Sequence, residues 1–242
     1  LKEKVYPSYT DVFSKKICEL AEKNKNVVAL TAAMPDGTGL SRFAKKFPER
    51  FFDVGIAEAH AVTAAAGMAS AGLKPVVAVY SSFLQRGYDQ VLHDVCIQEL
   101  PVFFCIDRAG LVGSDGETHQ GIFDVSFLSL VPGMSIMAPK NLWELENMLE
   151  FGVGFDGPLA VRYPRVQAYR GLKEFAAPIE YGKAEMLYEE SGTALFALGS
   201  MVSTGEHVRE KLKARGHACT LVNARFVKPL DTDMLDYLCK TH

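Results

Sequence analysis

The stretch KPVVAVYSSFLQRGYDQVLHDVCIQELPVFFCID, residues 74–107, decides the fold class. Two short apolar runs, at residues 75–80 and 101–107, stand on either side of a longer segment, residues 82–99, that we predict to be a helix. Apolar strands separated by helices are typical of a parallel sheet that is covered on both faces. The sequence therefore predicts an α/β fold.

The same alternation extends outward from this stretch through the first 165 residues. Thr10 and Asp11 are candidate caps of a helix that runs to residue 21, with apolar residues at helical spacing. We expect further strands at residues 26–34, 51–55 and 158–163, and further helices at residues 56–72 and 143–151. Together these elements predict a parallel-sheet domain over residues 1–165.

A second unit follows this domain. The segment from residue 163 to residue 181 contains Pro164, Pro178, Gly171 and mixed charge without a clear period, which indicates a linker at residues 166–180. Residues 181–242 then hold a strand–helix–strand pattern and the beginning of another helix. Roughly 60 residues with two strands bury too little apolar surface for an independent core. We therefore expect residues 181–242 to be part of a second α/β domain whose remainder is missing.

Composition excludes several classes of function. Lys and Arg number 26 and Asp and Glu 29, so the net charge of −3 gives no basic footprint for nucleic acid. Uncharged stretches such as residues 61–73 are too short for a membrane span, since none exceeds 15 residues, and the N-terminus lacks the layout of a secretory signal. Five cysteines without a CxxC pair argue against a zinc site or a disulfide framework. We expect a soluble cytoplasmic protein.

Polar residues at the carboxyl ends of the predicted strands mark a candidate site, because ligands of parallel sheets gather there. Glu58 lies where a strand turns into a helix. It is either a first-turn carboxylate stabilised by the helix dipole or a desolvated carboxyl that shares a proton near neutral pH. Tyr80 and Phe83 are either core aromatics or part of the site, and Arg86 either extends to water or meets an anion.

A third polar segment, DRAGLVGSDGETHQG, spans residues 107–121 and has no regular period. Long irregular segments inside a domain are commonly functional loops, although a flexible solvated excursion is the alternative. Arg162 and Arg165 follow a later strand and form either a solvated pair or, with Arg108, a phosphate clamp. The sequence lacks the P-loop, the dinucleotide-binding fingerprint and the serine-hydrolase elbow.

Long motifs at these positions resemble one enzyme family. The motifs are SYTDVF at 8–13, KFPERFFDVGIAEAHAVT at 46–63, KPVVAVYSSFLQRGYDQVLHDV at 74–95, LPVFFCIDRAGLVGSDGETHQGIFD at 100–124 and GPLAVRYPR at 157–165. They are similar to those of the 1-deoxy-D-xylulose-5-phosphate synthases, thiamine-diphosphate enzymes related to transketolase. One departure is Ala59, where the family often has Gln. The resemblance implies a pyrimidine-binding domain over residues 1–165, followed by the start of a transketolase C-terminal domain.

The resemblance also implies a reaction and roles for residues at matching positions. The reaction is the condensation of pyruvate with glyceraldehyde 3-phosphate with loss of CO₂, the first step of the non-mevalonate route to isoprenoid precursors. Glu58 matches the glutamate that hydrogen-bonds the aminopyrimidine of thiamine diphosphate and stabilises its imino tautomer. Phe83 matches the aromatic residue that stacks on that ring. Tyr80 and Arg86 are also expected to contact the cofactor.

The remaining matches concern the substrates. Tyr80, Arg108 and Arg165 match residues around the phosphate of glyceraldehyde 3-phosphate. Arg86, Asp115 and His119 match substrate-contacting positions, and we expect His119 to be catalytic together with Glu58.

One family motif is absent from this sequence. In the family, a GDG…N motif on a separate N-terminal domain holds the diphosphate and Mg²⁺; the nearest string here is SDG at 114–116. We therefore expect no metal ligand in this chain, no activity of the chain alone, a missing N-terminal domain or a chain that supplies it, and a homodimer. The alternatives are the C-terminal half of a split transketolase, a 2-oxo-acid dehydrogenase β subunit, or a non-catalytic remnant.

Overall fold

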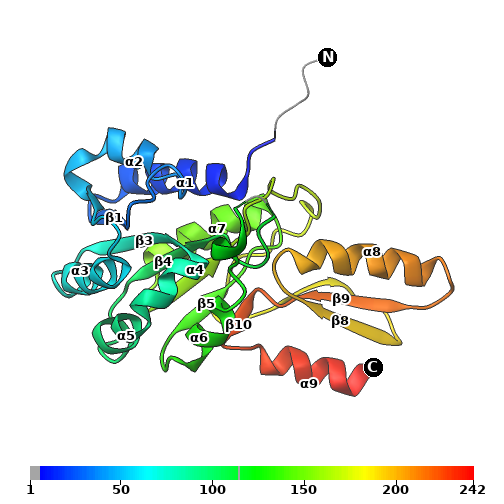
Figure 1. Ribbon diagram of the computed structural model, residues 1–242. Coiled ribbons are helices and arrows are strands. Elements are labelled where there is room, and N and C mark those ends of the chain that lie inside the picture. Colours follow the sequence, from blue (N-terminus) through cyan, green and yellow to red (C-terminus); the bar gives the residue numbers. More distant parts are fainter. Residues whose placement is uncertain (1–5, 114) are drawn as a thin grey trace, which may run out of the picture.

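A seven-stranded sheet forms the centre of the first part of the chain, in the strand order β10-β5-β6-β4-β3-β1-β2 (Figure 1). The computed structural model describes residues 6–113 and 115–242, so residues 1–5 of the expected first domain and Ser114 of the expected loop lie outside the described residues. The strands are β1 (Val27–Thr31), β2 (Phe51–Asp53), β3 (Lys74–Tyr80), β4 (Phe103–Asp107), β5 (Ser135–Met137), β6 (Leu159–Arg162) and β10 (Phe226–Lys228). All neighbouring pairs are parallel except β10 with β5.

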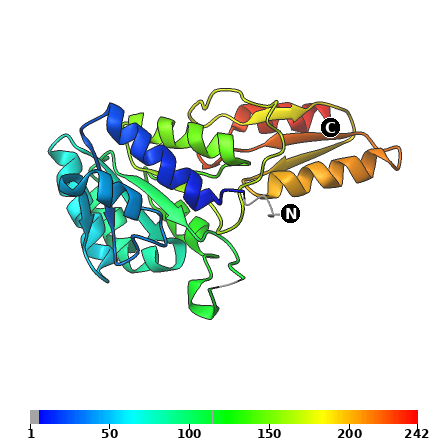
Figure 2. The ribbon, with the colours of Figure 1, turned by 90° about the horizontal axis from the view of Figure 1, so that it is seen from above.

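Both faces of this sheet are buried, as the apolar strands predicted. On β3, Val76 and Ala78 belong to one core cluster, whereas Val77 and Val79 belong to the other, because successive side chains point to opposite faces. The helices α1 (Tyr9–Lys23) and α7 (Leu142–Gly154) lie side by side over the first face (Figure 2). The helices α3 (Glu58–Ser70) and α6 (Asp124–Leu130) pack on the second. The predicted α/β fold is confirmed.

The first helix begins about two residues earlier than the sequence predicted. Ser8, rather than Thr10 or Asp11, is the N-cap of α1. The Ser8 hydroxyl accepts from the Asp11 amide at 3.1 Å, and the Asp11 carboxylate accepts from the Ser8 amide at 2.8 Å, which forms a capping box. The helix begins earlier because this reciprocal pair satisfies two backbone donors. Short elements without strong periodicity were not predicted, namely α2 (Ser41–Lys46), η1 (Pro48–Arg50), α6, β5 and β10.

The predicted helix at residues 82–99 is wrong in detail. The segment is divided into α4 (Ser81–Leu84), the 3₁₀ turn η2 (Gln85–Gly87), α5 (Tyr88–Gln90) and the π-helical turn η3 (Val91–Cys96). Gly87 is a poor helix former, and it lies so close to α3 that an added Cβ would be 3.2 Å from the Val62 side chain. Close packing against α3 therefore accompanies the break, and it brings residues 85–87 next to Glu58.

The C-terminal part has a three-stranded sheet in the order β7-β9-β8, formed by β7 (Glu185–Tyr188), β8 (Thr193–Ala197) and β9 (Cys219–Asn223). The helices α8 (Met201–Lys213) and α9 (Thr232–Thr241) belong to this part, and strand β7 was not predicted. Strand β10 leaves it and joins the large sheet. No helix among the described residues has the length and apolar character needed to cross a bilayer.

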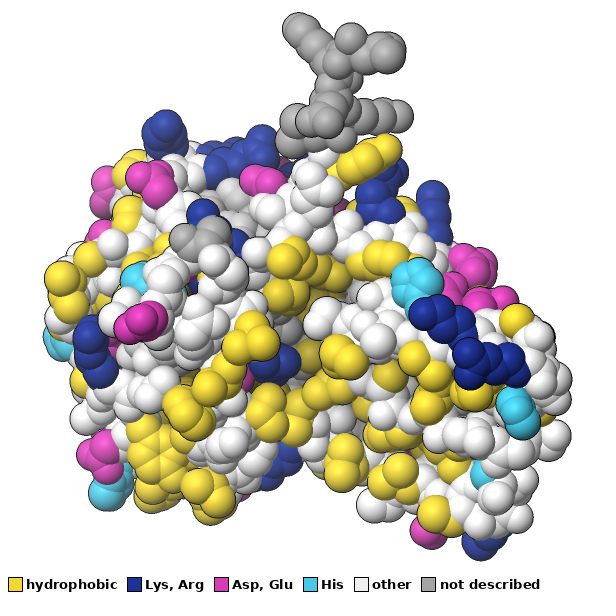
Figure 3. Space-filling model, turned by 45° about the vertical axis from the view of Figure 1, so that its right-hand side comes forward, with side chains coloured by type: hydrophobic (Ala, Val, Ile, Leu, Met, Phe, Trp, Pro, Cys, Tyr) yellow, Lys and Arg dark blue, Asp and Glu magenta, His cyan; other side chains and the backbone are white. Residues whose placement is uncertain are grey.

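Buried charges join the two parts. Lys140 and Glu144, around the start of α7, meet Glu185 of β7 and Arg225, which follows β9. Beside this junction, hydrophobic side chains gather around a hollow between the two parts (Figure 3).

Candidate active site

Three neighbouring strands bring the predicted site residues to one edge of the large sheet. Strands β6, β4 and β3 are adjacent and parallel, so their carboxyl ends meet at the same edge. Tyr80 ends β3, Arg108 follows β4 and Arg165 lies three residues beyond β6. The parallel order of β3, β4 and β6 therefore brings Tyr80, Arg108 and Arg165 to the same end of the sheet.

Glu58 is the first residue of α3, and its residue surface is only 2% exposed. Its carboxylate accepts from Arg86 of η2, with Nη1 at 3.2 Å from Oε1 and at 3.4 Å from Oε2. The Arg86 side chain is 59% exposed, so it covers the buried carboxylate from the solvent side. Both alternatives for Arg86 describe part of the structure: its side chain extends to water, and its guanidinium meets an anion, the Glu58 carboxylate.

Aromatic rings continue from Arg86 toward Arg108. The Arg86 guanidinium lies 5.3 Å from the centre of the Phe83 ring. Phe83 stacks against Tyr80 at a centroid distance of 5.6 Å, and His119 lies 5.0 Å from Phe83 and 5.9 Å from Tyr80. Burial raises the pKa of the Tyr80 hydroxyl above its ordinary value.

Two buried hydroxyls lie at the start of α4, next to Phe83. The Oγ atoms of Ser81 and Ser82 have no hydrogen-bond partner among the described residues. Unpaired buried hydroxyls carry a free-energy cost, so they are informative near a candidate ligand site.

Two arginines converge on one carboxylate at the other end of the site. The Arg108 guanidinium lies 4.0 Å from the Tyr80 ring centre, and its Nε is 3.3 Å from Oδ2 of Asp115. Arg165 pairs with the other oxygen of Asp115, and Arg108 also donates to the carbonyl of Gly37. Arg108 and Arg165 together line a pocket of about 420 Å³. Of the three arginines expected to form a clamp, Arg108 and Arg165 therefore lie close together, whereas Arg162 does not join them.

Sequence reasoning missed two polar residues beside this clamp. Asp107, the last residue of β4, is fully buried and accepts a hydrogen bond of 2.7 Å from Thr10 of α1. Burial raises the pKa of Asp107, against the opposing effects of Arg108 and of the hydrogen bond from Thr10. A carboxylate at the end of an apolar strand was the available signal for Asp107, whereas nothing local marks Thr10.

The loop at residues 107–121 is anchored over its described residues. Gly110 and Gly121 exchange backbone hydrogen bonds of 2.7 and 2.9 Å. A Cβ on Gly121 would lie 2.0 Å from the Arg108 carbonyl oxygen and 2.6 Å from the Ser81 side chain. This close approach fixes the base of the loop against α4, so the alternative of a flexible solvated excursion does not describe its two ends.

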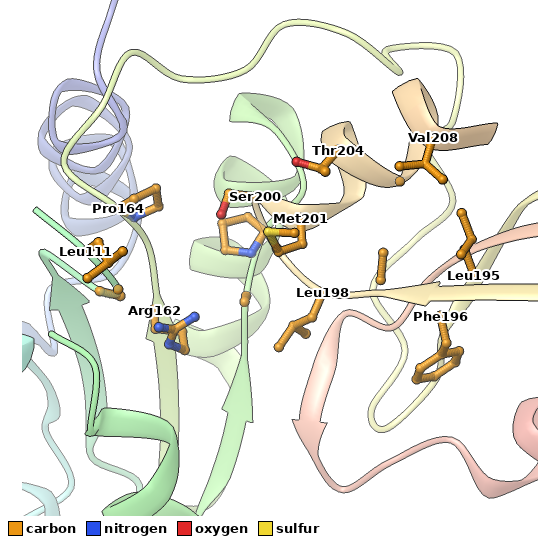
Figure 4. Close-up of a pocket in the computed structure, with 17 residues that line it drawn as sticks. Leu111, Arg162, Pro164, Leu195, Phe196, Leu198, Ser200, Met201, Thr204 and Val208 are labelled. Carbon is orange, nitrogen blue, oxygen red and sulfur yellow. The ribbon is translucent and has the colours of Figure 1, made fainter. Parts of the chain in front are cut away.

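Arg162 is not part of the clamp. It lies within β6 and pairs with both carboxylate oxygens of Asp124, at 2.7 and 3.2 Å. Together with Leu111, Leu198 and Met201 it lines a different and larger cavity of about 680 Å³ between the two parts of the chain (Figure 4). That cavity is mostly apolar and contains none of the eight predicted site residues.

Metal ligands and disulfides were not predicted in this chain. Within residues 6–113 and 115–242, no group of three or more His, Cys, Asp or Glu side chains is arranged to hold a metal ion. The five cysteines are free, and four of them are buried while Cys239 is exposed.

Comparison with known proteins places this geometry in a family. The family model for the transketolase pyrimidine-binding domain matches residues 6–170, and the model for the transketolase C-terminal domain matches residues 182–242. A 1-deoxy-D-xylulose-5-phosphate synthase of Lachnoclostridium phytofermentans is 62% identical over 235 residues, which cover 97% of this chain and 38% of that protein. The synthase of Dictyoglomus thermophilum is 54% identical over 242 residues, 39% of its length. The chain thus spans less than two fifths of these relatives.

Solved structures agree with this assignment. A split-gene transketolase, described as an inactive β4 tetramer, superimposes with a TM-score of 0.88 at 26% identity over 98% of this chain and 77% of that one. The transketolase of Campylobacter jejuni shares the fold, with a TM-score of 0.83 at 21% identity over 93% of this chain and 37% of its own. The chain therefore belongs to the transketolase pyrimidine-binding domain family and carries, after that domain, a segment that matches the transketolase C-terminal domain.

Proposed function

We propose that this chain is the pyrimidine-binding and C-terminal part of a 1-deoxy-D-xylulose-5-phosphate synthase, divided as 1–165, a linker at 166–180, and 181–242. The enzyme joins the carbonyl carbon of pyruvate to the aldehyde carbon of glyceraldehyde 3-phosphate and releases CO₂. The proposal is supported by identities of 50–62% to proteins of that name. The single observation that carries it is the unbroken row of contacts that leads from the buried Glu58 carboxylate to the Arg108 and Arg165 pair.

The residues at the Glu58 end fit the pyrimidine ring of thiamine diphosphate. A buried carboxyl group, the Phe83 ring that Arg86 links to it, and the unpaired hydroxyls of Ser81 and Ser82 form a set suited to a flat polar ring. When bound, thiamine diphosphate supplies the carbanion stabilisation that decarboxylation requires. Glu58 then holds a proton in a hydrogen bond to a ring nitrogen, and Phe83 stacks on the ring.

Arg86 has a second role at this end. Its contact with both oxygens of Glu58 compensates the buried charge while the carboxylate has no other partner. Once Glu58 bonds the cofactor instead, the largely exposed Arg86 side chain can turn toward a substrate carboxylate. We assign it to the cofactor and to pyruvate.

The residues at the other end fit a phosphate group. The guanidinium groups of Arg108 and Arg165 converge on Asp115, whose two oxygens stand where a phosphate would present its own. The Arg108 guanidinium lies against the Tyr80 ring, and His119 contacts the rings of both Tyr80 and Phe83, which supports a place for it between the two ends of the site. We assign His119 to proton transfer with the substrate and Asp115 to contact with it.

The proposed enzyme needs protein groups that this chain does not supply. The diphosphate and its Mg²⁺ are held outside this chain, by an N-terminal domain or a second chain, in an active homodimer. The relatives are more than twice as long, and one structural relative assembles as a tetramer. Free cysteines fit a reducing compartment, and we place the enzyme in the cytoplasm.

A test of the proposed function uses the complete enzyme that carries this sequence. With thiamine diphosphate and Mg²⁺, it should consume pyruvate and glyceraldehyde 3-phosphate in equal amounts and release one CO₂ per ketose phosphate formed. Transfer from a ketose donor without CO₂ would instead support the second candidate, a two-subunit transketolase, which the similarity to the split-gene protein favours. Activity that depends on lipoamide would support a 2-oxo-acid dehydrogenase β subunit, and failure to bind thiamine diphosphate would support a non-catalytic remnant.

A further inference from the structure

Both oxygens of the buried Asp107 carboxylate have partners. Its Oδ1 accepts from the Arg108 backbone amide at 2.7 Å, and its Oδ2 accepts from Thr10 Oγ1 at 2.7 Å. The same Oδ2 lies 3.2 Å from Nη1 of Arg108. One carboxylate therefore holds both the backbone and the guanidinium of the same arginine, while a hydroxyl from α1 holds the carboxylate.

Arg108 needs this support because its conformation is unfavourable. Its φ of +59° lies in the left-handed region, which costs free energy for a residue other than glycine unless surrounding contacts impose it. A free arginine side chain also has many rotamers, and ordering it to bind an anion costs conformational entropy. Contacts made before the substrate arrives remove that cost from the binding step.

We propose that Asp107 and Thr10 are positioning residues that hold Arg108 ready for the phosphate of the aldehyde substrate. This inference rests on the proposed function. Thr10 lines the pocket of about 420 Å³ that Arg108 and Arg165 share, whereas Asp107 is not part of its wall. Asp107 thus acts through Arg108 and does not touch the phosphate.

Asp107 contacts Arg108 directly and Thr10 contacts it only through Asp107, so we expect Asp107→Asn to weaken phosphate recognition more than Thr10→Val. Asp107→Asn keeps the volume but removes the charge that faces the Arg108 guanidinium. Loss of a hydrogen bond to a charged group corresponds to about a tenfold change in an equilibrium constant. Thr10→Val keeps the shape and removes only the hydroxyl, so its effect is smaller, about threefold, since one neutral donor is lost.

The experiment measures kcat/KM of the complete enzyme with pyruvate and two acceptors, glyceraldehyde 3-phosphate and unphosphorylated glyceraldehyde. The ratio of the two values reports recognition of the phosphate, and general damage to the fold lowers both values together. We expect the ratio to fall about tenfold in Asp107→Asn and about threefold in Thr10→Val.

Thr31→Val is the matched control. It also removes a buried threonine hydroxyl, which donates to the Ala78 carbonyl at 2.8 Å, but it lies outside the clamp. Its ratio should equal that of the wild type, and Thr10→Ser should restore the wild-type ratio.

Three outcomes are decisive. An unchanged ratio in Asp107→Asn and Thr10→Val, with an active wild type, overturns the positioning role and leaves the proposed function standing. An inactive wild type overturns the proposed function itself. Should Asp107→Asn fail to fold, the Thr10 variants decide. A ratio that is lowered in Thr10→Val and equal to the wild-type ratio in Thr10→Ser supports the positioning role. A ratio in Thr10→Val equal to that in Thr31→Val overturns it.

Discussion

The buried charges between the two parts of the chain lead to a sharp prediction about stability. Lys140 Nζ lies 3.0 Å from Glu144 and 2.6 Å from Glu185, while Arg225 lies 2.9 Å from Glu144 and 3.1 Å from Glu185. All four side chains are buried, and two positive charges balance two negative ones. Lys140→Met would leave two carboxylates with a single cation.

The magnitude follows from this balance. Removing one partner from a buried ion pair costs about 3–5 kcal/mol, because an uncompensated charge stays away from water. Adding Glu185→Gln to Lys140→Met removes the surplus charge and leaves Arg225 paired with Glu144. Interaction energies between neighbouring residues reach about 0.5–3 kcal/mol. The loss of stability in the double variant should therefore be smaller than the sum of the two single losses by about 1–3 kcal/mol.

The pH dependence of the free energy of unfolding tests the Lys140–Glu185 ion pair in a second way. Burial alone raises the pKa of Glu185, but the hydrogen bond from Lys140 and the charges of Arg225 and Lys140 outweigh it and lower the pKa below the usual 4.5. A lowered pKa in the folded state contributes stability above pH 4.5, and this contribution is lost as the pH falls further. The deficit of Lys140→Met should accordingly narrow below that pH.

Urea unfolding followed by circular dichroism measures these free energies for the wild type, both single variants and the double variant. A double variant whose loss equals the sum of the two single losses, at every pH, would refute the reasoning, since the charges would then act independently.

Further predictions concern the loop, the thiols and a surface carboxylate. Gly121→Ala should destabilise the protein by about 1–3 kcal/mol in urea unfolding, because its Cβ would meet the Arg108 carbonyl; a stability equal to the wild type would contradict the close approach. Iodoacetamide should label Cys239 first in the native protein, since burial raises the pKa of Cys96 to about 12 and the other three thiols are buried; peptide mass spectrometry that finds Cys96 labelled first would contradict this. The pKa of Glu190 is lowered to about 2 by a hydrogen bond from the Cys219 amide and by the charges of Lys213 and Arg209. Above pH 4.5, the melting temperature of the wild type should therefore exceed that of Glu190→Gln. This difference in melting temperature should disappear as the pH falls toward 2. A difference in melting temperature that persists at pH 2 would contradict the idea that the ionised Glu190 carboxylate causes it.

Much of the fold could be predicted because its strands are apolar on both faces. Residues 75–80 and 101–107 were recognised as strands for that reason, and β3 and β4 lie there at the centre of the sheet. Strands β5 and β10 have three residues each, too few to show a period. The antiparallel entry of β10 into the large sheet depends on tertiary packing that no local pattern carries.

The candidate site could be predicted only in part. The positions of Tyr80 and Arg108 at the ends of β3 and β4, and of Glu58 at the start of the helix after β2, could be predicted from the alternation of strands and helices. The pairing of Arg86 with Glu58 could not be predicted, because it needs the break at Gly87 that turns η2 toward α3. Thr10 reaches Asp107 across 97 residues of sequence, a contact that only the packing of α1 creates.

The most direct test of the central claim concerns the carboxyl of Glu58. In the complete enzyme with bound thiamine diphosphate, nuclear magnetic resonance can follow exchange of the proton on the thiazolium C2 carbon for deuterium. We expect Glu58→Gln to slow this exchange by about 10²–10⁴-fold, the usual contribution of a positioned acid or base, while the cofactor stays bound. Exchange at the wild-type rate in a variant that still binds the cofactor would contradict the role assigned to Glu58.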